Sequence, residues 1–130
     1  MMATIKGATI RNRIYAGGAH GNLSVAHGHA LLAAAAIGDV IEVLEIPIGI
    51  KFIGVRVLSE SGLGSSVTAT VKVGDKVLAS AVNMSGANAT VVKAIVPFST
   101  VDKQKLTVTI AGAEATGDIQ VIPEYVAEGY

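Results

Sequence analysis

The sequence predicts an all-β protein, an antiparallel β-sandwich of the jelly-roll-like kind with an extended N-terminal arm. Apolar residues make up 51% of the 130 residues and form short runs of Val, Ile, Thr and Ala rather than one long block. The chain contains 15 glycines, and many of them separate these runs. The runs recur about every 8–15 residues with no clear helical period, which is the spacing of strands in a sandwich or barrel.

Seven segments have the composition of strands, and turn residues bound each of them. The segments are 39–46, 50–59, 66–73, 76–82, 89–96, 104–110 and 117–126. Apolar and polar residues alternate most clearly in 66–73 and 104–110, and a period of two is typical of a half-buried strand. Gly74-Asp75 separates 66–73 from 76–82. A two-residue loop of this kind predicts a hairpin with a type I′ or II′ turn.

Two of these segments contain an irregularity, and a third is followed by one. The segment 39–46 does not alternate, and Glu42 and Glu45, three residues apart, are expected on opposite faces. The strand is therefore either covered on both sides or carries a bulge. Pro97 is expected to end the strand before it, and Pro123 predicts that the last strand lies at an edge or bulges there.

The N-terminal part is less regular. Residues 22–30 could supply an eighth strand, which would match an eight-stranded jelly roll. Residues 31–36 are rich in Ala and could form one turn of helix ended by Gly38. We expect residues 1–21 to form an extended arm that orders against a neighbour, and residues 22–130 to form the sandwich domain.

The charge content indicates assembly rather than catalysis. Only 15% of the residues are charged, which is too few to cover the surface of a small domain with solvated groups. We therefore expect part of the surface to be buried against other copies or another protein. The formal net charge is zero, which argues against direct nucleic-acid binding, and no membrane segment is visible. Residues 1–38 carry three positive charges and no acid.

No constellation of residues predicts a catalytic, cofactor-binding or metal site. The chain has no Cys, so it has neither a thiolate ligand nor a Cys nucleophile. His27 and His29 would share one face of a strand, as two metal ligands can. A cupin metal site needs a Glu shortly after them, where Ala33 and Ala34 stand, and no later His follows. We expect partly exposed, hydrogen-bonding histidines, no cofactor and no enzyme activity.

Candidate interaction residues lie near the two ends of the chain. They are Lys6, Arg11, Arg13, Tyr15, Tyr125 and Tyr130. The two arginines and Tyr15 alternate, so they would share one side of an extended arm. That side could be solvated surface, could dock on an acidic protein lattice or could contact nucleic acid. Tyr125 and Tyr130 are either interface anchors or residues packed inside their own chain.

Four stretches of the sequence resemble small structural proteins of tailed-phage virions. They are RNRIYAGGAHGNLSVAHG (11–28), AIGDVIEVLEIPIG (36–49), TVKVGD (70–75) and VIPEYVAEGY (121–130). The shared features are a GD-V-E-L-x-x-(L/I)-P-x-G motif, a valine-rich hairpin ending in V-G-D, and a final E-Y-V-x-(D/E)-G. In these motifs the chain is similar to capsid decoration, or cement, proteins with a jelly-roll-like β-sandwich.

The resemblance implies a non-enzymatic virion protein on the outer surface of the capsid, synthesised in the host cytoplasm. Its partners would be the major capsid protein and other copies of itself, with a trimer favoured over a dimer. It would stabilise contacts between major capsid subunits and use a terminal arm for part of the contact. Two alternatives are another phage module, in a tail or head fibre, and a carbohydrate-binding β-sandwich.

Overall fold

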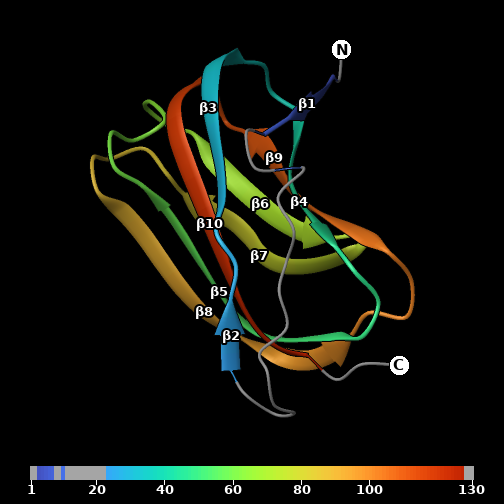
Figure 1. Cartoon of the computed structure of the whole chain (residues 1–130). Coiled ribbons are helices and arrows are strands. Elements are labelled where there is room, and N and C mark those ends of the chain that lie inside the picture. Colours follow the sequence, from blue (N-terminus) through green and yellow to red (C-terminus); the bar gives the residue numbers. More distant parts are fainter. Residues whose placement is uncertain (1–2, 8–9, 11–22, 128–130) are drawn as a thin grey trace.

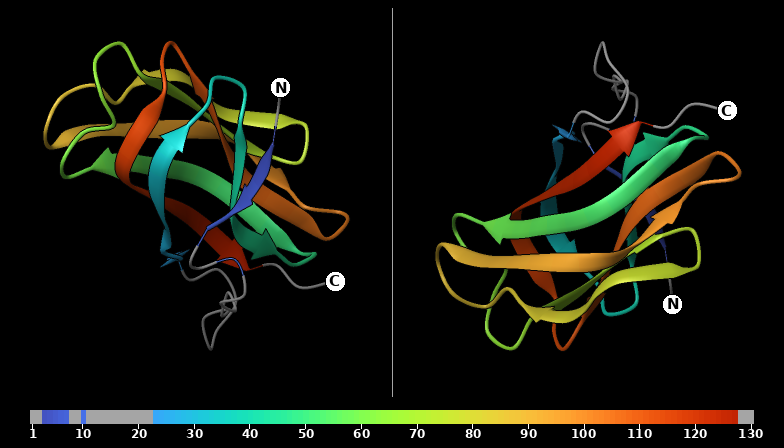
Figure 2. Two further views of the ribbon diagram at one scale, coloured as in Figure 1. Left: turned by 90° about the horizontal axis from the view of Figure 1, so that it is seen from above. Right: turned by 90° about the horizontal axis from the view of Figure 1, so that it is seen from below.

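The computed structural model describes residues 3–7, 10 and 23–127, and all regular structure in this part is β (Figure 1). The strands are β1 (Thr4–Lys6), β2 (Leu23–Val25), β3 (Gly28–Ala35), β4 (Val40–Ile46), β5 (Ile50–Ser59), β6 (Thr68–Val73), β7 (Lys76–Asn83), β8 (Ala89–Ser99), β9 (Gln104–Ala111) and β10 (Ala115–Ala127). They form two layers that face each other, as the end views in Figure 2 show.

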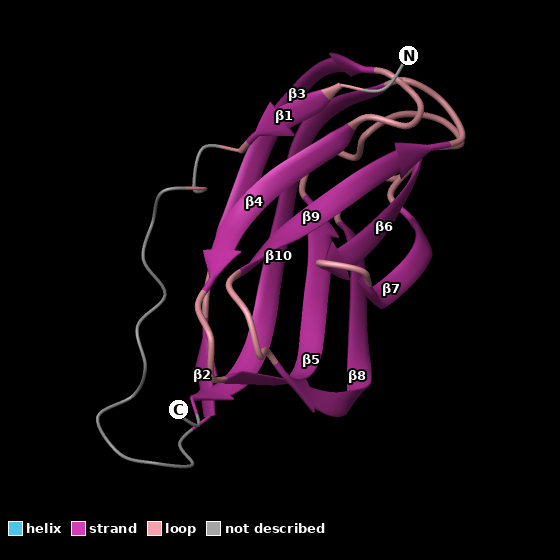
Figure 3. Cartoon of the chain, turned by 90° about the vertical axis from the view of Figure 1, so that its right-hand side faces the viewer, coloured by secondary structure: helices cyan, strands magenta, loops and turns pink. Residues whose placement is uncertain are grey.

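The order of the strands is that of a jelly roll. Sheet A has the order β1-β4-β9-β6-β7, and sheet B has the order β2-β10-β5-β8, with β3 also paired to β10. The eight strands β3 to β10 therefore form two four-stranded layers, β4-β9-β6-β7 over β3-β10-β5-β8 (Figure 3). This arrangement is the double Greek key of a jelly roll. The predicted all-β, jelly-roll-like sandwich is confirmed.

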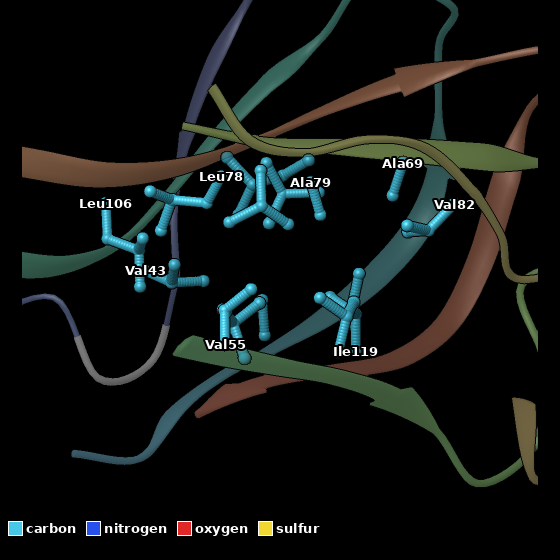
Figure 4. Packing of buried hydrophobic residues seen from close by; sticks show 14 of the residues in the cluster. Val43, Val55, Ala69, Leu78, Ala79, Val82, Leu106 and Ile119 are labelled. Carbon is cyan, nitrogen blue, oxygen red and sulfur yellow. The ribbon is translucent and has the colours of Figure 1, made fainter. Parts of the chain in front are cut away.

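The core lies between the two sheets and is built from inward-facing aliphatic side chains. Figure 4 shows Val43, Leu78 and Leu106 of sheet A directed towards Val55 and Ile119 of sheet B. The largest buried side chains are Tyr125 and Phe52, which come from β10 and β5. Burying one such side chain contributes about 1.5–3 kcal/mol, so the packed interior is the main stabilising element of the fold.

All seven segments predicted as strands form strands. Residues 50–59 form β5 with the predicted limits, and the hairpin between β6 and β7 turns at Gly74 and Asp75. Gly74 has a φ of 58°, which suits the first central position of a type II′ turn. These local features were predictable because alternation and turn residues specify them within a few residues.

A bulge explains the irregular pattern of β4. The pairing with β9 passes from Glu42–Thr107 to Leu44–Leu106, so Val43 and Leu44 together occupy one step of the ladder. Both are buried. The bulge shifts the alternation by one residue, so Glu42 and Glu45 lie on the same outer face. The bulge alternative is confirmed, and the expectation that the two glutamates face opposite sides is wrong.

Both prolines lie inside strands. The expectation that Pro97 ends its strand is wrong, since β8 continues to Ser99. Pro97 lies where the register with β5 passes from Gly54–Ala94 to Phe52–Phe98, so residues 95–97 have no cross-strand partner and the missing N–H group removes no ladder bond. Strand β10 lies inside sheet B, so the edge alternative for Pro123 is wrong. Pro123 itself pairs regularly with Val55, and the β10–β5 register shifts only between Glu124 and Tyr125, where the extra residue is Ile53 of β5, so the bulge lies in the partner strand next to Pro123 and not in β10. The break between β2 and β3 lies opposite Pro123.

Two expectations about the N-terminal part need correction. Residues 31–35 belong to strand β3 and pair with β10, so the single helical turn is wrong. Tertiary pairing overrides the weak helical propensity of so short an Ala-rich run. Strand β1 pairs in parallel with β4, so residues 4–6 belong to sheet A and not to a separate arm. Residues 8–9 and 11–22, which include most of the predicted arm, lie outside the described residues.

Gly112 provides a sharp test of the turn between β9 and β10. Its φ is 87°, and a Cβ atom there would overlap the backbone oxygen of Ser66. We expect Gly112→Ala to lower the free energy of unfolding by about 2–4 kcal/mol, measured by chemical denaturation. Gly86→Ala is the matched control, since a Cβ atom there meets nothing within 4 Å, and its effect should stay within about 0.5 kcal/mol. Equal effects would contradict this structure of the turn.

Candidate interaction surfaces

The outer faces of the two sheets differ in chemistry. On sheet A, most of the outward side chains are Thr, Lys or Glu. They include Thr4, Lys6, Glu42, Glu45, Thr68, Thr70, Lys72, Lys105, Thr107 and Thr109. We call this surface the sheet-A face. Its side chains are readily solvated, as expected of a surface that stays in water.

Ion pairs join three strands across the sheet-A face. The Glu42 carboxylate binds the Lys6 ammonium group and lies 3.4 Å from Lys105 Nζ, while Glu45 pairs with Lys103 at 3.2 Å. The hydrogen bond with Lys6 lowers the pKa of Glu42 and outweighs its partial burial. The same hydrogen bond raises the pKa of Lys6. Because of the β4 bulge, both glutamates are available for these pairs.

The outer face of sheet B carries many more aliphatic side chains, and they come from all its strands. We define the sheet-B face by its outward residues, which are Leu23, Val25, His29, Leu31, Lys51, Ile53, Arg56, Leu58, Thr90, Val92, Asp118, Gln120, Ile122, Glu124 and Val126. Leu31 is 75% exposed and Val92 is 61% exposed. On the edge strand β8, Val96 is 82% exposed. Exposed aliphatic residues gathered on one sheet are typical of a surface that another protein covers.

One ion pair lies among these aliphatic side chains. Arg56 on β5 and Glu124 on β10 approach to 3.7 Å. Arg56 is directly opposite Ile122 on one side and Val92 on the other, and Glu124 is opposite Val25. The pair therefore lies near the middle of the sheet-B face, and it balances one positive charge with one negative charge.

The two histidines lie next to Gln120 on the same outer side of sheet B. The ring of His27 is 2.7 Å from Gln120 Oε1 and stacks on the ring of His29 with centroids 6.1 Å apart. Gln120 is cross-strand from His29 and also contacts Asp118. Burial raises the pKa of Asp118, but hydrogen bonds from Ser61 outweigh it and the net pKa is lowered. Within the described residues no three His, Asp, Glu or Cys side chains are placed to hold a metal ion.

Two hollows lined by described residues are open to solvent. One, of about 320 Å³, lies between the β6–β7 hairpin and the end of β8, where Lys76 Nζ is 5.5 Å from the centre of the Phe98 ring. Another, of about 440 Å³, lies on the sheet-A face beside Lys103 and Lys105. Neither is lined by a nucleophile with a neighbouring base, which is the minimum for covalent catalysis. None of the described residues forms a helix suited to crossing a membrane.

The residues predicted to make interactions lie in different environments. Lys6 lies on β1 and is committed to its ion pair with Glu42. Tyr125 is 1% exposed and belongs to the core of its own chain, which is the second of the two alternatives for it. Burial there raises the pKa of its hydroxyl group. Arg11, Arg13, Tyr15 and Tyr130 lie outside the described residues.

The position of the sheet-B face was not predicted from the sequence. Its valines and leucines lie in strands whose inward positions are also aliphatic, so they look like further core residues in the sequence. In β8, for example, Val91 packs against the core while its neighbour Val92 is exposed. The low charge content was the available signal, and it indicated that a covered surface exists without indicating where.

The fold and these surfaces define a single jelly-roll β-sandwich with one polar face and one face on which exposed aliphatic residues surround polar ones. No family model matches the sequence, and no curated protein matches it. The fold is nevertheless found in solved structures of phage capsids. A chain in the capsid of Ralstonia phage GP4 superposes with a TM-score of 0.71 at 18% sequence identity, and the match covers 98% of this chain and 100% of that chain.

Two further capsids contain chains with the same fold. A chain in the capsid asymmetric unit of cyanophage Pam1 gives a TM-score of 0.61 at 20% identity, covering 89% of this chain and 94% of that chain. A chain in the acid-stable capsid of Helicobacter pylori bacteriophage KHP30 gives a TM-score of 0.54 at 12% identity. The match covers 83% of this chain and 90% of that chain. Identities of this size show a shared fold.

The ion pair of Glu42 predicts a pH dependence of stability. Because the folded-state pKa of Glu42 lies below its ordinary value of 4.5, its contribution is complete above that pH and is lost as the pH falls through the folded-state pKa. At pH 7, Glu42→Gln should lower the free energy of unfolding by roughly 0.5–1 kcal/mol. The difference in the free energy of unfolding between Glu42→Gln and the unchanged protein should vanish at low pH, where Glu42 is itself protonated.

Denaturation curves from pH 7 down to pH 3 test this dependence. Glu45→Gln is the control, since its partner Lys103 is more exposed and the pair should contribute no more than a few tenths of a kcal/mol. An effect of Glu42→Gln that is the same at every pH would contradict the assignment.

The burial of Tyr125 predicts a large effect on the isolated chain. We expect Tyr125→Ala to lower the free energy of unfolding by about 3–5 kcal/mol, because the change leaves a cavity in the core. The loss should be independent of protein concentration. An interface anchor would instead lose its effect on dilution. Val101→Ala, at an exposed valine in the β8–β9 loop, should change stability by less than about 0.5 kcal/mol.

Proposed function

We propose that this chain is a structural, non-enzymatic component of a tailed-phage virion. More specifically, we propose a capsid decoration, or cement, protein that binds the outer surface of the capsid and stabilises contacts between major capsid subunits. Its partners are the major capsid protein and other copies of itself, and it needs no cofactor. Its place of synthesis is the host cytoplasm.

One observation carries the proposal. The fold matches a chain of a phage capsid over almost the whole of both chains, 98% of this one and 100% of the other. The similarity is thus one between complete small sandwiches, rather than between this chain and a domain within a larger enzyme. The sequence motifs that resemble decoration proteins support the same function independently of the fold.

The surface chemistry supports assembly as the physical basis of this function. A chain with 15% charged residues places a large share of its exposed aliphatic side chains on one sheet. Covering that surface removes apolar area from water, at about 25 cal/mol per Å². A contact that is weak in one copy becomes strong when it is repeated across a shell, since many copies must release together.

Residues near the N-terminus are proposed to make the contact with the capsid. Residues 1–38 carry three positive charges and no acid, so this part of the chain suits an acidic protein surface. Arg11, Arg13 and Tyr15 would make this contact. The order of the oligomer, for which the sequence favours a trimer, is decided by measuring the mass in solution.

Co-sedimentation with capsids tests the function directly. Purified protein is mixed with heads assembled from the major capsid protein of the same phage and centrifuged through a density gradient. We expect saturable binding and an increased resistance of the heads to heat and chelators. Protein that stays at the top of the gradient, or that sediments only with tails, would contradict a decoration role and favour the tail or head-fibre alternative.

Charge reversal locates the contact. We expect Arg11→Glu with Arg13→Glu to reduce the affinity for capsids at least about tenfold, since each reversal places like charges together. The matched control is Lys72→Glu with Lys76→Glu, two lysines of the hairpin strands β6 and β7. The control should bind as the unchanged protein does. Binding of both double variants at full affinity would refute the role of the arginines.

A further inference from the structure

The sheet-B face has the properties of a contact between protein chains. Leu58 and Ile122 lie near its centre, and the more exposed Leu31 and Val92 lie towards its two edges. The sheet-A face, in contrast, is covered by threonines and paired charges. An apolar surface on only one side of a sandwich indicates that this side, and not the other, is buried in the working state.

The charges of the sheet-B face indicate what covers it. Arg56 and Glu124 are adjacent, 3.7 Å apart, and lie among aliphatic side chains. A two-fold axis that passes between them would bring each Arg56 beside Glu124 of a second copy and each Glu124 beside the other Arg56. Like-charged groups would remain apart. The face is therefore complementary to itself, which is the requirement for a two-fold contact between identical surfaces.

The ends of the face agree with this arrangement. Lys51 lies at one end, cross-strand from Val126, and Asp118 lies at the other end, cross-strand from Leu31. Two copies that meet face to face with their strands running in opposite directions place the Asp118 end of one over the Lys51 end of the other.

From these observations we infer that the sheet-B face binds the same face of a second copy of this chain through a two-fold contact. Reciprocal pairs between Arg56 and Glu124 lie at its centre, and aliphatic residues from β2, β3, β5, β8 and β10 surround them. The sheet-A face remains in water. This contact goes beyond the proposed binding to capsids, because it forms between free copies and requires no shell.

Two charge variants distinguish this contact from a purely structural role of the ion pair. Arg56→Glu leaves two acids at the centre of the face, and Glu124→Arg leaves two bases. Each variant alone should associate at least about tenfold more weakly than the unchanged protein, as measured by sedimentation equilibrium over a range of concentrations. Each should remain folded by circular dichroism, since a half-exposed ion pair contributes little to stability.

Mixing the two variants is the decisive step. An acidic face and a basic face are complementary, so an equimolar mixture should reach twice the mass of either variant alone. The pair within each chain is still broken in the mixture, so only a contact between chains can restore association. If the chain also forms trimers through another surface, the same doubling takes a trimer to a hexamer.

Lys72→Glu is the control, because Lys72 lies on the sheet-A face, and it should not change self-association. The inference is overturned if the unchanged protein has the same mass as Arg56→Glu at every concentration, or if the mixture gains no mass. It is also overturned if Lys72→Glu weakens association as much as Arg56→Glu does. Because no capsid is present, these outcomes are independent of the test of capsid binding.

Discussion

The structure depends on one constraint, the shortage of charged side chains relative to the surface that a small sandwich must expose. On sheet A the outward side chains are mostly Thr, Lys and Glu, and Glu42 and Glu45 pair with Lys6, Lys105 and Lys103. On sheet B the Arg56–Glu124 ion pair lies among exposed aliphatic residues. The hydrophobic effect holds the fold together between the sheets, and in the proposed assembly it would act a second time on the outside of sheet B.

The jelly-roll topology makes this division possible. Strands β3 to β10 alternate between the layers in such a way that each sheet is assembled from distant parts of the chain. Each strand can then carry a common inward pattern of aliphatic residues and an outward pattern that is specific to its sheet. The bulge in β4 adjusts this pattern locally, because it brings Glu42 and Glu45 to the same outer face while Val43 and Leu44 both remain buried. A change of function requires only the outward residues to change.

Local patterns in the sequence were enough to predict the strands and the turn at Gly74, since period-two alternation and turn residues act over short distances. The strand β3 was harder to predict, because its Ala-rich run has no strong pattern and is specified by pairing with β10. The position of Pro123 inside a sheet depends on the break between β2 and β3, which lies almost a hundred residues away. The sheet-B face could not be located because an exposed valine such as Val92 and a valine packed against the core such as Val91 are identical in a sequence.

The most direct measurement is footprinting of side chains by hydroxyl radicals, first on the dilute protein and then on the particle into which it assembles. If one face of the sandwich is covered and the other stays wet, Leu31, Leu58 and Ile122 will be modified much more slowly in the particle. Val40 and Val77, which lie on the strands of sheet A, will react at the same rate in both states. Equal protection of both sheets, or protection of sheet A alone, would contradict this division of the surface.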